Sequence, residues 1–349
     1  MRRLFILSLL PFLAPSAAAA QALPPVPPTV EQSVPQDVLS DPRRKIVTVI
    51  VENDSFGGGT DKNYTSGVRV NVTSLEAPLP ALAHVIDRII PTFEINKTSS
   101  YYYSFGQSLY TPRDITRATA NPNDRPWAGF LYGSMGMASL AGNHIDEMEA
   151  TLGIVGPLAL GRQAQSFIHE YLTDSPKPEG WSHQLKNEPA AMLAWQRGWP
   201  MFVSGRVGND FWSVKPYVGT TLGNVHTYAD TGFTIRLSPY DSRWQDTPIR
   251  VRPAMPGTGI YQIPQDKWSW ELFSGVEGRA VAHDIFLDGN TFASSYSVEK
   301  KNFVADANAG AAVTYKNTRL SYTVVYRTKE FYLQDHPEIF GAVSLGVRF

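Results

Sequence analysis

The sequence predicts an all-β protein, an antiparallel transmembrane β-barrel of about 12 strands with a short helix in an extracellular loop. Downstream of residue 20, no stretch approaches the roughly 20 consecutive apolar residues that a spanning helix needs. Apolar and polar residues instead alternate in segments of about nine to eleven residues, the length of a tilted transmembrane strand. The chain ends on the aromatic residue Phe349, which resembles the C-terminal signal of outer-membrane barrels.

The N-terminus predicts export. Residues 1–20 read as a signal peptide, with Arg2 and Arg3 before an apolar run and Ala18-Ala19-Ala20 as a cleavage site. The alternative, an uncleaved anchor, is disfavoured because the apolar run is too short to span a bilayer. Residues 21–44 contain six prolines and predict an extended leader without a core of its own. The barrel is expected in residues 45–349.

Period-two patterning defines the expected strands. In residues 68–73, three valines alternate with Arg69, Asn71 and Thr73, which fits one face in lipid and one in a wet lumen. A soluble β-sandwich gives the same alternation, so the combination with an export signal carries the prediction. The expected strands are 46–54, 65–74, 99–108, 127–139, 145–155, 187–198, 202–212, 214–223, 230–237, 267–283, 292–299, 303–315, 318–328 and 339–349.

Two segments predict helices instead of strands. Residues 79–90 are amphipathic, and residues 159–172 place Gln165 and His169 four positions apart, hence on one helix face. Composition excludes several functions. The net charge of −1 gives no argument for nucleic acid, and the absence of cysteine excludes disulfides, zinc–thiolate sites and a cysteine nucleophile. No G-x-S-x-G motif is present, so a hydrolase would use an activated water.

Polar motifs converge on one mouth of the predicted barrel. The loops after the first, third and fifth strands leave from the same end, and their length predicts that this end faces outside, with residues 75–98 as an exception at the other end. Asp54 and Thr65 lie on inward faces of paired strands, where their oxygens can hold a hard cation such as Ca²⁺. The alternative is a polar rim without an ion. His169 is a candidate general base, and the alternative is a structural histidine.

The motifs together resemble a known family. They are V-x-V-E-N-D, T-D-K-N-Y-T-S-G, G-Q-S-L-Y-T-P, D-R-P-W-A-G, Q-S-F-I-H and G-W-S-H-Q-L-K-N-E, in this order. They resemble the outer-membrane lipid A 3′-O-deacylases over residues 45–349. The resemblance implies a twelve-stranded barrel, so some expected strands should merge. It also implies a calcium-dependent esterase that acts on lipid A of the outer leaflet.

The family pattern also implies roles for individual residues. It implies Asn53, Gln165 and His169 as catalytic residues, with His169 as general base, supported by Asp174 or alternatively Glu179. The remaining expected site residues are Asp54 and Thr65 at the metal and Arg113, Arg117 and Trp181 at the substrate. We expect a monomer in the outer membrane. The alternatives are a non-enzymatic barrel, such as a channel or structural protein, and a calcium-dependent phospholipase with a serine nucleophile.

Overall fold

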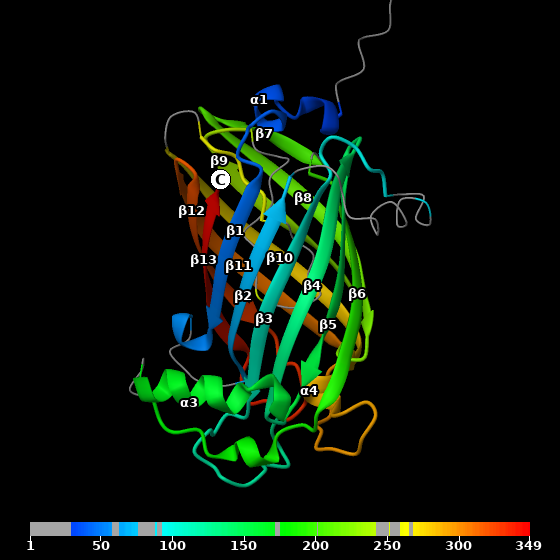
Figure 1. Cartoon of the computed structure of the whole chain (residues 1–349), viewed down its shortest axis with the longest axis vertical. Coiled ribbons are helices and arrows are strands. Elements are labelled where there is room, and N and C mark those ends of the chain that lie inside the picture. The colour runs from blue at the N-terminus through cyan, green and yellow to red at the C-terminus, as the bar shows by residue number, and fades with distance from the viewer. Residues whose placement is uncertain are drawn as a thin grey trace, which may run out of the picture.

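The computed structural model is a closed antiparallel barrel of twelve strands (Figure 1). It describes residues 29–57, 63–75, 88, 93–171, 175–200, 202–241, 251, 259–264 and 268–349. The strands are β1 Lys45–Asn53, β2 Asn63–Ser74, β3 Ser100–Thr111, β4 Ala128–Ala141, β5 His144–Val155, β6 Glu188–Gly198, β7 Val203–Val207, β8 Asp210–Gly223, β9 His226–Ser238, β10 Trp268–Asp284, β11 Phe303–Tyr315, β12 Thr318–Arg327 and β13 Glu338–Arg348. The helices are η1 Glu31–Ser33, α1 Gln36–Leu39, η2 Asp54–Phe56, η3 Pro157–Ala159, α3 Gly161–Tyr171, η4 Gly180–His183 and α4 Ile285–Asp288.

Two pairings close the barrel and confirm the predicted architecture. From β1 to β6 and from β8 to β13, strands adjacent in sequence pair with each other, and the ring is closed by the pairings of β1 with β13 and of β6 with β8. The short β7 pairs with β8 and lies outside this closed ring. Among the described residues, no helix is long and apolar enough to cross a membrane.

Two expected strands differ from the structure, and one expected helix lies largely outside the described residues. Residues 292–299 form no strand, because their backbone bonds outside any ladder: the N–H of Phe292 donates to Glu188 at 3.3 Å, and the N–H of Val298 donates to the Leu287 carbonyl at 2.8 Å. The expected strand 202–212 is split by a turn at Gly208, whose φ of 60° suits glycine, so its second half joins β8. Of residues 79–90, the structure describes only Arg88.

The two faces of each strand meet opposite environments, as the alternation predicts. On β2, Arg69, Asn71 and Thr73 are fully buried in the lumen, whereas Val68 and Val72 are 41% and 43% exposed on the outer wall. The register pairs Ile50 with Arg69 and Thr48 with Asn71, so the inward faces of β1 and β2 coincide. An apolar exterior around a polar interior is the arrangement of a barrel in lipid.

Charged side chains fill the lumen in bonded groups. Arg69 lies 2.6 Å from a Glu149 oxygen that also accepts from Tyr102 at 2.7 Å. Further along the barrel, Arg327 binds both oxygens of Asp306 at 2.9 Å. Paired and hydrogen-bonded charges are the form in which buried ionic groups are tolerated. The interior is therefore a bonded polar core that holds the strands in one arrangement.

A connection enters this core from the barrel mouth at which β1 begins. We call this the opposite mouth, because it lies opposite the end that carries α3. The long β9–β10 connection, residues 239–267, leaves that mouth together with residues 75–99, and only the latter was expected to be long there. Its Val251 is buried against Ile50. The backbone N–H of Val251 donates to Glu52 at 2.9 Å, and its carbonyl accepts from Tyr132 at 2.8 Å. Glu52 is the penultimate residue of β1, so Val251 lies deep in the lumen, near the end of β1 that is far from this mouth.

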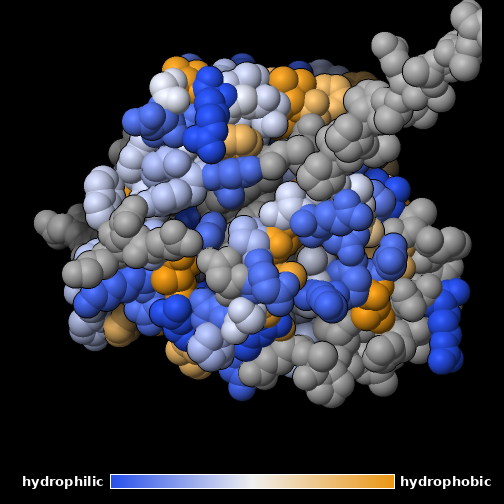
Figure 2. Space-filling view, turned by 90° about the horizontal axis from the view of Figure 1, so that it is seen from above, coloured by the Kyte–Doolittle hydropathy of each residue, from blue (hydrophilic) through white to orange (hydrophobic). Residues whose placement is uncertain are grey.

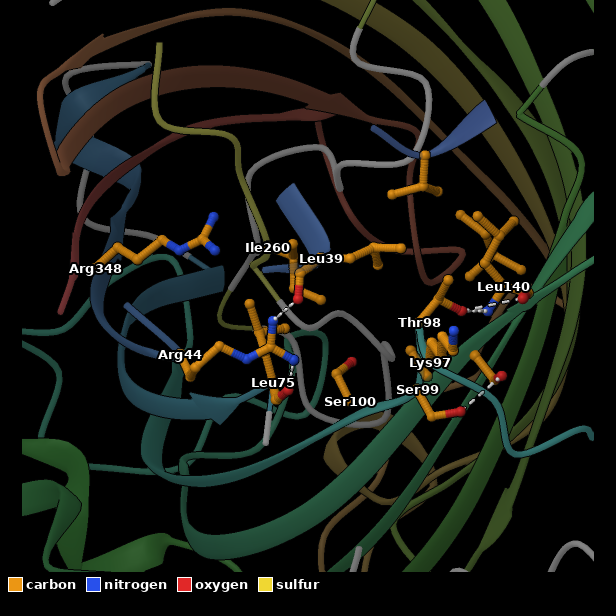
Figure 3. Close-up of a pocket in the computed structure, with 14 residues that line it drawn as sticks. Leu39, Arg44, Leu75, Lys97, Thr98, Ser99, Ser100, Leu140, Ile260 and Arg348 are labelled. Carbon is orange, nitrogen blue, oxygen red and sulfur yellow. Dashed lines mark hydrogen bonds between the residues drawn. The ribbon is translucent and has the colours of Figure 1, made fainter. Parts of the chain in front are cut away.

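The N-terminal segment folds across the opposite mouth. We expected residues 21–44 to be extended, but residues 29–44 form η1 and α1, and Val30 packs on Leu140 and Ile145. Most of the visible surface of this mouth is hydrophilic (Figure 2). Between the segment and the barrel lies a cavity of about 70 Å³, where Arg44 donates to the carbonyls of Leu39 and Leu75 (Figure 3). The expected signal peptide lies outside the described residues and stays a prediction.

Candidate active site

One mouth carries η2, α3, η4 and α4, and we call it the α3 mouth (Figure 1). The expected site residues that the structure describes lie on these elements or on the strands and connections beside them. As expected from strand direction, the connections after β1, β3 and β5 all emerge there. α3 lies against β3 and β4, and η2 lies against β13. The site is therefore assembled from connections that are far apart in sequence but share one end of the barrel.

Asn53 and Asp54 form the junction between β1 and η2, and their side chains have different structural roles. Asn53 is extended and caps η2, because its side-chain oxygen accepts from the Ser55 backbone N–H at 2.7 Å. Asp54 follows as the first residue of η2 and is buried. Tyr322 donates to the Phe56 carbonyl at 2.6 Å and fixes η2 on the barrel wall. The carboxylate of Asp54 is thus held at the rim by a turn with little freedom.

The neighbouring backbone offers oxygen atoms suited to a hard cation. Asn53 is the last residue of β1 that pairs with β2, opposite Ser66, and η2, which begins at Asp54, contacts β2. Between β2 and β3 the register shifts from Tyr64 to Ser66, which makes Thr65 the extra residue of a β-bulge. The side chain of Thr65 lies outside the described residues. No group of three or more His, Cys, Asp or Glu residues that could hold a metal occurs among the described residues. One carboxylate with neutral oxygens fits calcium better than a softer metal.

α3 presents Gln165 and His169 on its buried face. Gln165 accepts a hydrogen bond from the Trp181 indole N–H at 2.7 Å, which ties α3 to η4. The Trp181 ring lies 5.0 Å from the ring of Trp127 and directly over Gly161, where an added Cβ would come within 2.6 Å of it. Gly161 therefore lets the helix begin in contact with the indole. The Nε2 of Gln165 is buried without a hydrogen-bond partner among the described residues.

The ring of His169 is fixed by a backbone carbonyl. Its Nδ1 lies 2.6 Å from the oxygen of Pro176, and a carbonyl oxygen can only accept, so Nδ1 carries the hydrogen. In the neutral ring the lone pair is therefore on Nε2, the atom able to take a proton. Asp174, expected to support His169, lies outside the described residues. The alternative residue, Glu179, is partly exposed with its carboxylate 3.7 Å from Lys177.

The residues expected to bind substrate lie at the same mouth in different surroundings. Arg113 is half-exposed and forms an ion pair with Asp335. Arg117 is exposed and donates to Thr119 at 3.0 Å. Trp181 is almost fully buried, and its described contacts are with protein side chains. Substrate contact by these three residues stays a prediction, and the structure adds a positioning contact to Gln165 for Trp181.

Sequence reasoning missed the bonds that hold the outer connections together. Glu188 accepts from Asn224 at 3.0 Å and from the backbone N–H of Thr291 at 2.9 Å. In α4, Asp288 accepts from Lys300 at 2.9 Å. Burial acts to raise the pKa of Asp288, but the hydrogen bond with His283 and the charge of Lys300 outweigh it and hold the pKa below its usual value of 3.8. Only their position in loops of a barrel rim could have suggested these residues.

Comparisons with known proteins match the whole chain. A family model described as outer membrane protein LpxR matches residues 4–349. No curated protein matches the chain. The structure of LpxR from Salmonella typhimurium aligns with a TM-score of 0.70 at 18% identity, covering 87% of this chain and 100% of that one. This likeness shows the fold.

Two autotransporter barrels are also similar, with lower scores. The translocator domain of NalP from Neisseria meningitidis has a TM-score of 0.40 at 12% identity and covers 88% of this chain and 90% of its own. The β domain of the Bordetella autotransporter BrkA has a TM-score of 0.41 at 9% identity and covers 88% and 99%.

Proposed function

This chain belongs to the LpxR family of outer-membrane proteins, and on that premise we propose that it removes 3′-linked acyl chains from lipid A as a calcium-assisted esterase. One observation carries the proposal. His169 is fixed through Nδ1 on the buried face of α3, at the same mouth as the buried carboxylate of Asp54. A histidine with a fixed tautomer and a carboxylate suited to a cation are the parts that metal-assisted hydrolysis requires.

The chemistry follows from the lone pair on Nε2 of His169. A water molecule attacks the ester carbonyl carbon while His169 takes one of its protons at Nε2. The ester C–O bond then breaks, and the departing sugar alkoxide receives that proton, which leaves a free acid and a lipid A hydroxyl. Pro176 stabilises the charged imidazolium because its carbonyl accepts from Nδ1. Trp181 and Gln165 hold α3 in place through this cycle.

Calcium would be held by the Asp54 carboxylate with oxygens of Asn53 and Thr65. When bound, it supplies a Lewis acid that polarises the ester carbonyl. The exposed cations Arg113 and Arg117 can bind the phosphates of lipid A, which arginine grips bidentately. Two connections at the opposite mouth are two-residue turns, at 142–143 and 316–317, and turns of this length are typical of periplasmic ends, which favours the α3 mouth as the outer one.

The test is mass spectrometry of lipid A from cells with and without the protein. Expression of the wild-type chain should shift lipid A by the mass of the 3′-linked acyl group. Asp54→Asn removes the charge at nearly constant size and should abolish the shift, whereas Glu299→Gln, at an exposed acid of the same mouth, should retain it. Unmodified lipid A in cells with folded wild-type protein in the outer membrane would overturn the proposal.

A channel is the alternative from another class, and one observation disfavours it. Val251 sits in the lumen between Ile50, Glu52 and Tyr132. A porin-type channel requires a water-filled lumen. We therefore place the function at the mouth, between barrel and lipid.

A further inference from the structure

α3 has an exposed apolar face in addition to the face that packs on the barrel. Gly161, Gln165 and His169 form its buried face. Phe167 and Tyr171 are 56% and 66% exposed, and their ring centroids lie 5.2 Å apart with the rings tilted by 37°. Because a helix turns about 100° per residue, this pair lies about half a turn from the buried face.

The exposed surface of α3 is divided between apolar and polar residues. Leu158 and Leu160, just before the helix, are 62% and 49% exposed. These four residues form what we call the α3 apolar face. A different stripe of the same helix carries Arg162 and Glu170, both exposed. An amphipathic exposed surface of this kind is typical of helices that lie in a membrane interface.

The α3 apolar face continues the lipid-facing wall of the barrel. Leu152 on the outer side of β5 is 70% exposed, and Leu158 follows only three residues after the strand ends at Val155. α3 lies across the end of the barrel, roughly perpendicular to the strands (Figure 1). Since the strands cross the membrane, the axis of α3 is roughly parallel to the membrane plane.

We propose that α3 is an interfacial helix whose apolar face rests in the lipid leaflet at the α3 mouth, at the boundary between headgroups and hydrocarbon. Continuity with the barrel wall favours lipid over a second copy or another protein. Phe167 and Tyr171 are residue types that anchor barrels at this depth. The exposed cations Arg162 and Lys177 suit anionic headgroups.

This placement has a consequence for catalysis, which rests on the proposed function. His169 lies between Phe167 and Tyr171 in sequence and on another face of the same helix. The depth of the apolar face therefore sets the height of Nε2 relative to the bilayer. An ester near the sugar of a lipid lies at the same boundary, so the helix holds the base where such an ester is found.

The absence of cysteine from the chain allows a direct test. Single variants Phe167→Cys and Tyr171→Cys are labelled with an environment-sensitive fluorophore and reconstituted in phosphatidylcholine vesicles. Bromine in the acyl chains reports lipid contact, and iodide on both sides reports water contact. We expect strong quenching by brominated lipid and severalfold weaker quenching by iodide than at the control variants Arg162→Cys and Glu170→Cys, on the polar stripe. Leu152→Cys gives the reference for the barrel wall.

Two results would overturn the inference. One is iodide quenching at positions 167 and 171 equal to that at 162 and 170. The other is protection from iodide without quenching by brominated lipid, accompanied by crosslinking between copies, which would assign the face to a second chain. The fluorescence needs neither substrate nor catalysis, so it is decisive even if the protein does not act on lipid A. All four helix positions are exposed, and heat-modifiable migration in electrophoresis checks that each barrel is folded.

Discussion

The substitution His169→Asn distinguishes the roles of the two ring nitrogens, because it can keep the hydrogen bond made by Nδ1 and removes the base Nε2. An asparagine amide can reach the Pro176 carbonyl in place of Nδ1, which in the wild type lies 2.6 Å away. It provides no base in place of Nε2. General-base assistance contributes about 10²–10⁴-fold, which corresponds to about 2.7–5.4 kcal/mol at 1.36 kcal/mol per tenfold. We expect turnover to fall by that factor while the connection after α3 remains bound.

The comparison with His169→Ala gives the second magnitude. Alanine loses the base and also the bond to Pro176, whose net contribution is about 0.5–1.5 kcal/mol. Both variants should release acyl chains equally slowly in a mass-spectrometric rate assay on detergent-dispersed lipid A. Only His169→Ala should show faster hydrogen exchange in residues 161–171. Glu170→Gln, at the exposed neighbouring position, is the control and should keep the wild-type rate.

Wild-type turnover in His169→Asn would refute the assignment of Nε2 as the base. Equal hydrogen exchange in the asparagine and alanine variants would refute the tether to Pro176. The two measurements are independent, so the hydrogen bond to Pro176 can be confirmed even if Nε2 is not the base.

Three further changes test other parts of the structure. Trp181→Phe removes the donor to Gln165, leaves a buried carbonyl unmatched at about 1–3 kcal/mol, and should speed hydrogen exchange in α3 and lower turnover. Glu52→Ala removes the acceptor of the Val251 N–H and should produce conductance bursts in planar bilayers, where the wild type is silent. Because the pKa of Asp288 is lowered in the folded protein, its charge stabilises the outer connections at pH values above about 3.8. This stabilisation is lost as the pH falls through the pKa of Asp288 in the folded protein, which lies below 3.8. Asp288→Asn should remove that acid-induced step in pepsin cleavage of residues 285–302.

Each of these expectations has a matched control or a clear contrary result. Trp268→Phe changes an exposed tryptophan of the outer wall and should leave α3 unaffected. Conductance of Glu52→Ala equal to that of the wild type would show that Val251 is held by other contacts. A pepsin profile of Asp288→Asn that keeps the wild-type acid step would assign this step to another carboxyl group.

The barrel could be predicted because lipid and lumen impose opposite demands on alternate residues of every strand. The valines and polar residues of β2 show this directly. An expected strand was wrong where an alternating segment has no neighbouring strand to pair with. Residues 292–299 alternate weakly between apolar and polar. The backbone N–H of Thr291, which directly precedes them, donates to Glu188 and not to a neighbouring strand. Period-two patterning contains no information on whether a neighbouring edge is available.

The site could be predicted only in part. Motif spacing indicated Asp54, Gln165 and His169, and the structure brings all three to one mouth. The groups that orient them are a carbonyl at Pro176 and an indole at Trp181. A carbonyl has no signature in sequence, because every residue carries one, and a tryptophan near a membrane reads equally well as an anchor. Thr65 and Asp174 stay predictions in their side-chain roles.

The tripeptide at the end of β1 explains why the lumen and the rim can have separate functions. Glu52 still follows strand alternation, so it faces the lumen and accepts from Val251. Asn53 ends the strand by capping η2, which breaks the alternation. Asp54 is thereby released from the strand register and held by a turn against the wall. A lumen filled with bonded charges can then act as a rigid support, while the Asp54 carboxylate lies just beyond it at the rim, where the proposed chemistry at the membrane surface would use it.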